Sequence, residues 1–105
     1  MSGFRVRTLI TLDSSVSARR NGWRGVCEFG GIVSESGDRL FGFEAIAEGT
    51  DQLLPGKETD VTLRLWAPMP AGLTAPRSIR LFDGGTQVAM GHVSAVLPTD
   101  RDGKA

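Results

Sequence analysis

A pair of adjacent glycines, Gly84-Gly85, constrains the fold of this chain more than any other feature. They join an apolar run at residues 79–82 to a longer stretch that ends in Val96-Leu97. Glycine adopts the positive φ values that a tight reversal demands, so the pair predicts a β-hairpin. The second arm reads as a strand that still needs a glycine at Gly91. The last part of the chain is therefore predicted to be two antiparallel strands.

Period-two alternation of apolar and polar residues recurs along the rest of the chain, and helical periodicity does not. In the first run, one face holds Phe4, Val6, Thr8, Ile10 and Leu12, and the other holds Arg5, Arg7, Leu9 and Thr11. Further strands are expected at residues 24–33, 39–47, 58–67, 78–82 and 87–97. Such short strands with frequent turn signals predict an all-β fold, a small antiparallel six-stranded β-barrel that leaves no exposed strand edges.

Three segments between these strands are expected to be loops. Residues 13–22 are polar and rich in turn formers, which predicts a long mobile connection. Residues 48–57 contain Pro55-Gly56, which suits a reversal. Residues 67–76 hold three of the five prolines and are expected to form a rigid loop. The strand at 39–47 has apolar residues on both sides, which predicts burial on more than one face: Leu40, Phe41, Phe43 and Ile46.

The length of 105 residues has room for one domain, which we expect to span residues 1–98. Residues 99–105 are expected to form a flexible C-terminal tail. No apolar run approaches the length of a membrane span, and residues 1–5 show no apolar signal core, so we expect a cytoplasmic protein with no membrane partner. With Cys27 as its only cysteine, the chain can form no internal disulfide.

No set of catalytic groups stands out, and we expect no enzymatic activity. His92 is the only histidine, and a catalytic pair with Cys27 would require a spatial coincidence. Cys27 is expected to be a small buried hydrophobe. The carboxylates lack metal-ligand spacing, and the phosphate-binding pattern G-x-x-x-x-G-K-[S/T] is absent from the sequence. We therefore expect no cofactor, metal or nucleotide.

Positive charge is concentrated near the N-terminus, although the chain as a whole carries twelve basic and twelve acidic residues. The first 25 residues hold five arginines against one aspartate. Arginine pairs with phosphate or carboxylate in a planar, bidentate way, so these residues are candidate binding groups. The alternative is that they are solvated strand residues that prevent edge-to-edge aggregation.

Three sequence segments together resemble the C-terminal barrel (domain 3) of the elongation factor Tu family. Pro55-Gly56, ahead of the run 61–65, is similar to the P-G-D turn of that family. Residues 22–25, Gly-Trp-Arg-Gly, fall where the family has G-Y-R-P. The family segment R-E-G-G-R-T-V-G-x-G and its following V-L are matched by Gly84, Gly85, Val88, Gly91, Val96 and Leu97, with Asp83 in place of Glu. The resemblance covers about residues 4–98.

This resemblance implies a stand-alone barrel that performs no chemistry and recognises partners. In the family the barrel packs against the GTPase domain, helps to contact the T-stem of aminoacyl-tRNA and meets the exchange factor. Thr86 and Ala95 stand where the family has an arginine and a basic or polar residue, which removes partners for phosphate. Phe82 replaces another arginine; it either belongs to a protein-contact surface or packs beneath its own turn.

The function predicted from these features is a non-enzymatic protein-binding module that could act on the translation apparatus. Its expected contact residues are Arg19, Arg20, Trp23, Arg24 and Phe82. The alternative is an RNA- or tRNA-binding module that uses Arg5, Arg7, Arg19, Arg20 and Arg24. A protein partner is favoured because the residues after position 25 are net acidic. Trp66 is the second tryptophan, and it is expected to pack with Arg64 as a cation–π pair or to serve as a binding platform.

Overall fold

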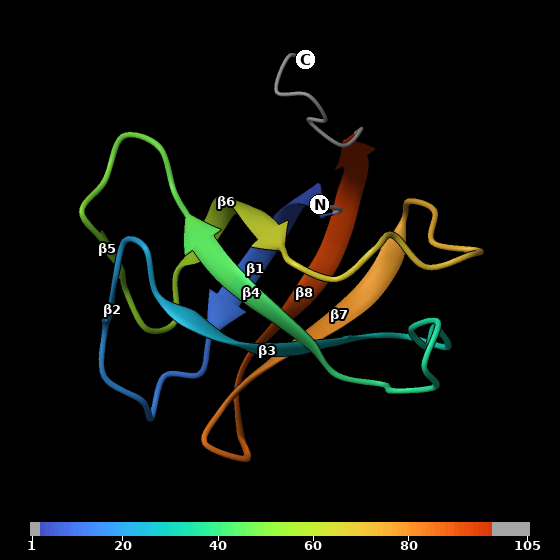
Figure 1. Cartoon of the computed structure of the whole chain (residues 1–105). Helices are drawn as coiled ribbons and strands as arrows, with labels where there is room; N and C mark the ends of the chain where they lie inside the picture. The colour runs from blue at the N-terminus through green and yellow to red at the C-terminus, as the bar shows by residue number, and fades with distance from the viewer. Residues whose placement is uncertain (1–2, 98–105) are drawn as a thin grey trace.

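The computed structural model describes residues 3–97, which contain strands and no helix (Figure 1). The strands are β1 (Phe4–Leu12), β2 (Arg19–Arg20), β3 (Arg24–Phe29), β4 (Phe41–Ile46), β5 (Gln52–Leu53), β6 (Glu58–Leu65), β7 (Arg77–Asp83) and β8 (Thr86–Leu97). Accordingly, the described part of the chain has no helix with the length and apolar character needed to cross a bilayer. The predicted tail at 99–105 lies outside the described residues, and the domain boundary at residue 98 stays a prediction.

Six of the strands form a closed antiparallel barrel in the order β1-β6-β4-β3-β7-β8, and pairing of β8 with β1 closes it. The predicted fold class is thereby confirmed. A sheet that closes on itself has no free edge, so partners cannot add a strand to this barrel. A binding surface on the barrel wall is therefore made by side chains on its outer face.

The alternation in β1 gives the barrel its inside and outside as predicted. Phe4, Val6, Thr8, Ile10 and Leu12 are all buried. The hydroxyl of Thr8 is satisfied inside the core, because it donates a hydrogen bond of 2.8 Å to the carbonyl oxygen of Val61. Phe41 packs edge-on against both Phe4 and Phe29, with ring centroids 6.5 and 5.3 Å apart. The interior is thus filled by side chains.

The glycines of the closing hairpin behave as the sequence predicts. Gly84 and Gly85 have φ values of 62° and 88° and form the turn between β7 and β8. Gly91 is the Cα partner of both Ile10 and Ile79. A Cβ at this glycine would lie 2.8 Å from the Cα of Ile10, and closer still to a backbone oxygen of β1. Glycine is therefore required where β1 and β8 approach each other to close the barrel.

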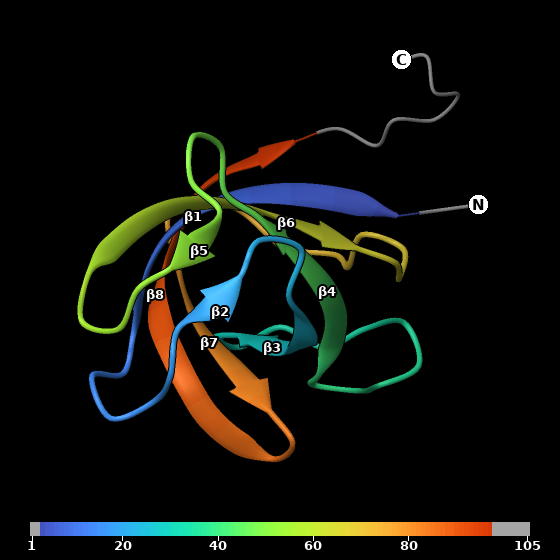
Figure 2. The same ribbon diagram turned by 90° about the vertical axis from the view of Figure 1, so that its left-hand side faces the viewer.

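Residues 13–22, which composition predicts to be a long mobile connection, contain a short strand. Arg19 and Arg20 form β2, which pairs with Leu53 and Gln52 of β5. Figure 2 looks onto the side of the molecule where these two short strands lie. Leu53 is buried in the main core, so the small sheet packs against the barrel. A ladder of two residues is too short to show alternation, which is why sequence reasoning missed it.

The strands on either side of residues 30–40 are shorter than predicted. β3 ends at Phe29, and Gly31 follows with a φ of 76°. β4 begins at Phe41, which leaves Leu40 50% exposed, and Ile46 at its far end is 38% exposed. The prediction that this strand is buried on both faces was wrong, because the outside of a closed barrel stays open to solvent.

Candidate functional site

A row of charged side chains crosses the outer face of four neighbouring strands. The register pairs Arg24 of β3 with Glu44 of β4, Glu44 with Arg64 of β6, and Arg64 with Arg5 of β1. Arg7 follows two residues later on β1, opposite Thr62. The barrel therefore gathers on one surface arginines that lie up to about sixty positions apart in the sequence.

An apolar row runs beside these charges. Phe82 of β7 is the Cα partner of Val26 on β3, and Val26 is the partner of Gly42 on β4. Next in the row is Trp66, which directly follows β6 and is 47% exposed. Because Gly42 has no side chain, the indole ring lies over it, and a Cβ there would be 3.5 Å from the ring. The result is a half-exposed aromatic group that packs over Gly42 on the barrel wall.

The arginine that stacks on Trp66 is Arg24. Its guanidinium carbon lies 5.6 Å from the centre of the indole ring, a cation–π distance. The expected pairing of Trp66 with Arg64 was wrong, because β4 lies between β3 and β6 and brings Arg24 within reach. Arg64 instead forms an ion pair with Glu44, with Nη1 to Oε1 at 3.5 Å.

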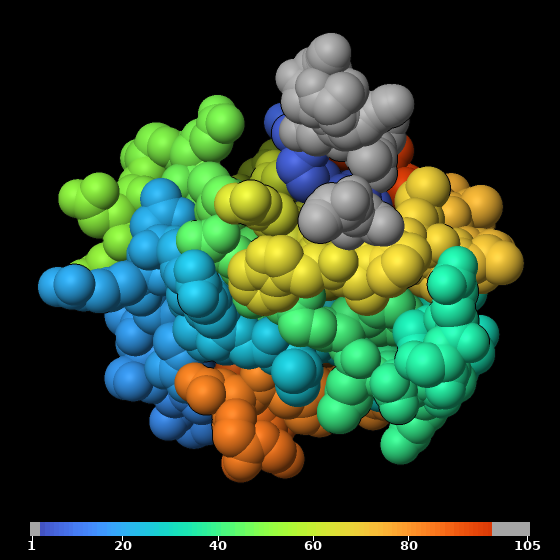
Figure 3. Space-filling view, in the orientation of Figure 1, coloured from blue at the N-terminus to red at the C-terminus, as the bar shows by residue number. Residues whose placement is uncertain are grey.

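A second set of charges borders the apolar row on its other side. Glu28 of β3 binds two arginines: Arg39 Nη1 lies 3.2 Å from Oε2, and Arg80 contacts Oε1. Leu40 is half exposed just before β4. We call the whole surface the β3–β4–β6 face: Arg5, Arg7, Arg24, Val26, Glu28, Arg39, Leu40, Gly42, Glu44, Arg64, Trp66, Arg80 and Phe82. Figure 3 shows much of it, with cyan β3 and green β4 between the yellow segment after β6 and the orange β7–β8 turn.

The residues predicted to bind a protein partner do not form one patch. Arg24 and Phe82 belong to the β3–β4–β6 face, whereas Arg20 is exposed on β2. Arg19 is 5.4 Å from the ring centre of Trp23. Whether these residues bind a partner stays a prediction, but the structure divides them among three places.

Arg19 and Trp23 have a clear structural role beside the face. The guanidinium of Arg19 lies 3.2 Å from a carboxylate oxygen of Asp83, next to the β7–β8 turn. The ring of Trp23 packs edge-on against buried Phe43 at a centroid distance of 5.1 Å. Together they tie the segment before β3 to the closing hairpin, and the indole of Trp23 faces the core rather than solvent.

The residues of the alternative nucleic-acid site are brought together only in part. Arg5 and Arg7 lie on the outer face of β1, near Arg64 and Arg24. Arg5 and Arg64 are direct cross-strand partners, an arrangement that is unfavourable for like charges unless counter-charges are present. Arg19 and Arg20 lie on β2, outside this row. Sequence reasoning missed Arg64, Glu44 and Trp66 as neighbours of Arg24, since only the strand register places them together.

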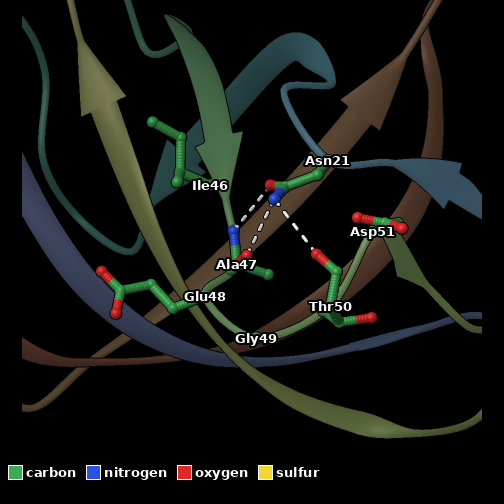
Figure 4. A pocket seen from close by; sticks show the side chains of 7 residues that line it. All are labelled: Asn21, Ile46, Ala47, Glu48, Gly49, Thr50 and Asp51. Atoms are coloured by element: carbon green, nitrogen blue, oxygen red, sulfur yellow. Dashed lines mark hydrogen bonds between the residues drawn. The ribbon is translucent and has the colours of Figure 1, made fainter.

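An open hollow of about 700 Å³ lies where β4 leads into β5 (Figure 4). Asn21 forms one wall, and its side-chain amide is fully engaged. It donates to the carbonyl oxygens of Ala47 at 2.8 Å and Thr50 at 3.2 Å, and its oxygen accepts from the N–H of Ala47 at 2.8 Å. Asn21 therefore holds the 47–50 turn in place and has no remaining amide hydrogen with which to bind a ligand.

Cys27 and His92 cannot act as a catalytic pair in this fold. Cys27 is fully buried in the core, as predicted, whereas His92 is exposed on the outer face of β8. Burial raises the pKa of the Cys27 thiol above its ordinary value, because the thiolate would lose its hydration. Between residues 3 and 97 there is also no group of three or more His, Cys, Asp and Glu residues placed to hold a metal ion.

The buried thiol predicts a loss of stability at high pH. The unfolded chain releases the Cys27 proton near the ordinary pKa of 9.0, while the folded chain retains it. The free energy of unfolding should therefore fall above pH 9 by up to about 1.4 kcal/mol per pH unit. Denaturant unfolding at about pH 8 and about pH 10 tests this. The chain has no tyrosine, and Cys27→Ala should show a smaller decrease; equal decreases in both proteins would contradict the prediction.

Comparison with protein-family models and with curated proteins finds no match for this chain. The resemblance to the elongation factor Tu barrel thus stays a prediction from the motifs. A function is therefore inferred from the geometry of the β3–β4–β6 face.

Proposed function

We propose that this protein is a non-enzymatic binding module whose β3–β4–β6 face recognises a protein partner. The observation that carries the proposal is the exposed ring of Trp66, held over Gly42 and flanked by Arg24 and Arg64. Tryptophan, phenylalanine and arginine are enriched at protein interfaces, and tryptophan and arginine dominate their binding energy. The resemblance to a translation-factor barrel supports a partner in the translation apparatus and a cytoplasmic location.

A capture experiment with matched variants tests this function. The tagged protein is incubated with lysate of its source cells, and retained proteins are compared between wild type, a face variant and a control. The face variant is Arg24→Ala with Trp66→Ala. The control is Arg20→Ala, which removes an exposed arginine on β2. A protein partner should bind saturably to the wild type and to the control, and it should be absent from the proteins retained by the face variant. If the face variant retains the partner, the assigned surface is wrong.

RNA binding is a second candidate, favoured by one observation. Arg5 and Arg64 are cross-strand partners with Arg7 next to them, so three guanidinium groups gather on adjacent strands. Binding to phosphates would then fall steeply between low and physiological salt. A gel-shift titration with tRNA at both salt concentrations tests it, and no shift at low salt would dispose of this candidate.

A further inference from the structure

Basic residues outnumber acidic ones on the β3–β4–β6 face, although the whole chain is neutral. The face holds six arginines, Arg5, Arg7, Arg24, Arg39, Arg64 and Arg80, against two glutamates, Glu28 and Glu44. The remaining sequence carries six basic and ten acidic residues. These residues therefore carry a net positive charge, with Asp60 of β6 at their border beyond Thr62, and they attract anionic partners at distances within the screening length of about 8 Å.

Ion pairs within the face already neutralise both of its glutamates. Glu28 is held between Arg39 and Arg80, and Glu44 is paired with Arg64. Arg24 stacks on Trp66, and within residues 3–97 it forms no ion pair, although Glu44 is its cross-strand partner. The positive charge that remains lies directly beside the exposed indole.

From these features we infer that the occupant is an acidic polypeptide segment that carries an aromatic or aliphatic side chain. The inference rests on the proposed function and states the chemistry of its partner. Carboxylates of the segment would pair with Arg24 and Arg64, while its apolar side chain packs between Trp66 and Phe82 over Val26. The apolar row spans β7, β3 and β4, so a segment lying across these strands meets both kinds of contact.

The same features favour a polypeptide over a nucleic acid. The guanidinium of Arg24 lies 5.6 Å from the centre of the Trp66 ring, so a base that stacked on this ring would have to compete with it. Glu28 and Glu44 lie within the face and would repel a phosphate backbone that runs across it. A polypeptide can space its carboxylates to meet Arg24 and Arg64 and place apolar residues between them, whereas a nucleic acid carries a phosphate at every nucleotide.

Synthetic peptides provide a direct test on the intact protein. The probe is a Glu- and Asp-rich peptide with one central Phe, titrated into isotope-labelled protein while backbone amide and indole NMR shifts are followed. Comparison peptides replace the Phe by Ala, or the acidic residues by Lys. A single-stranded RNA oligonucleotide is the third comparison. We expect saturable shifts at Trp66 and along β3, β4 and β6 with the acidic Phe peptide, and weaker binding with both altered peptides.

Variants that remove one group at a time locate the interaction. Trp66→Ala should weaken binding about tenfold, and Arg64→Gln about fivefold at low salt. Lys57→Gln is the matched control, because it also removes one positive charge but lies seven residues away from Arg64 along the chain, just before β6. This control should bind like the wild type.

Three results would overturn the inference. One is the lack of any saturable shift with the acidic Phe peptide, and another is equal loss of affinity in Lys57→Gln and Arg64→Gln. The third is tighter binding of the RNA than of the peptide, which would assign the face to nucleic acid. The capture experiment tests the proposed function separately. If a captured partner depends on Trp66 and Arg24 but the acidic Phe peptide does not bind, the proposed function stands. Only the inference that the partner segment is acidic is then rejected.

Discussion

Replacement of Gly91 by alanine should lower the free energy of unfolding by about 3 kcal/mol or more. This loss is at the high end of the range for substitutions that overpack a site. The added Cβ would lie 2.8 Å from the Cα of Ile10, and closer still to the carbonyl oxygen of Leu9. These are backbone atoms of β1, so no side chain can rotate away to make room. β1 and β8 would have to separate where they close the barrel. Denaturant unfolding followed by tryptophan fluorescence measures the effect.

Gly42→Ala is the matched control for this prediction. Gly42 is also a strand glycine on the barrel, but a Cβ there would meet only the Trp66 ring at 3.5 Å, an ordinary contact distance. Because alanine in a strand loses less backbone entropy on folding, Gly42→Ala should be neutral or stabilise by up to about 1 kcal/mol. If both variants have the same stability, close approach is not the reason for the glycine at position 91.

Replacement of Phe43 by alanine should give the second large effect, a loss of about 4 kcal/mol. Phe43 is fully buried and supports the edge of the Trp23 ring at 5.1 Å. Its removal leaves a cavity that the barrel backbone cannot collapse to fill. For a domain of this size, the loss corresponds to a fall in melting temperature of about 15–30 °C. Thermal unfolding followed by circular dichroism measures it.

Phe43→Leu separates cavity formation from the loss of an aromatic contact. Leucine retains most of the buried volume, so the cost should stay below about 1.5 kcal/mol. The fluorescence of Trp23 should change in both variants, because its edge contact with the Phe43 ring is lost in each. A cost for Phe43→Leu equal to that of Phe43→Ala would show that the ring contact, not the filled volume, stabilises this part of the core.

The barrel could be predicted because its signals are local. Alternation in β1 assigns each residue to the inside or the outside, since side chains on a strand point to opposite faces in turn. The paired glycines at 84–85 specify a reversal, whatever the rest of the chain does. These features require no knowledge of which strands are neighbours.

The small sheet and the exposed residues around β4 could not be predicted in the same way. β2 and β5 are two residues each and lie more than thirty positions apart, so neither carries a pattern of its own. Leu40 and Ile46 look like core residues by type, but Leu40 precedes β4 and Ile46 is the outward-facing last residue of that strand, so solvent reaches both. Hydrophobicity alone does not say where a strand stops.

The candidate surface was only partly predictable for a related reason. The sequence placed Arg24 beside Trp23, whereas the fold stacks Arg24 on Trp66, forty-two positions later. Trp23 faces the core, and its neighbour Arg19 binds Asp83 across the molecule. Exposure and partner choice for these aromatic side chains depend on the strand order, which alternation does not encode.

The sequence by itself determined that this chain is an all-β protein, how the residues of β1 divide between two faces, and where its closing hairpin turns. Those properties follow from side-chain alternation and glycine backbone freedom, which act over a few neighbouring residues. Only the tertiary structure decided that six arginines from four barrel strands and the segment before β4 share one face with Trp66. Strand order and register make that arrangement, and they result from closing the barrel around a common core.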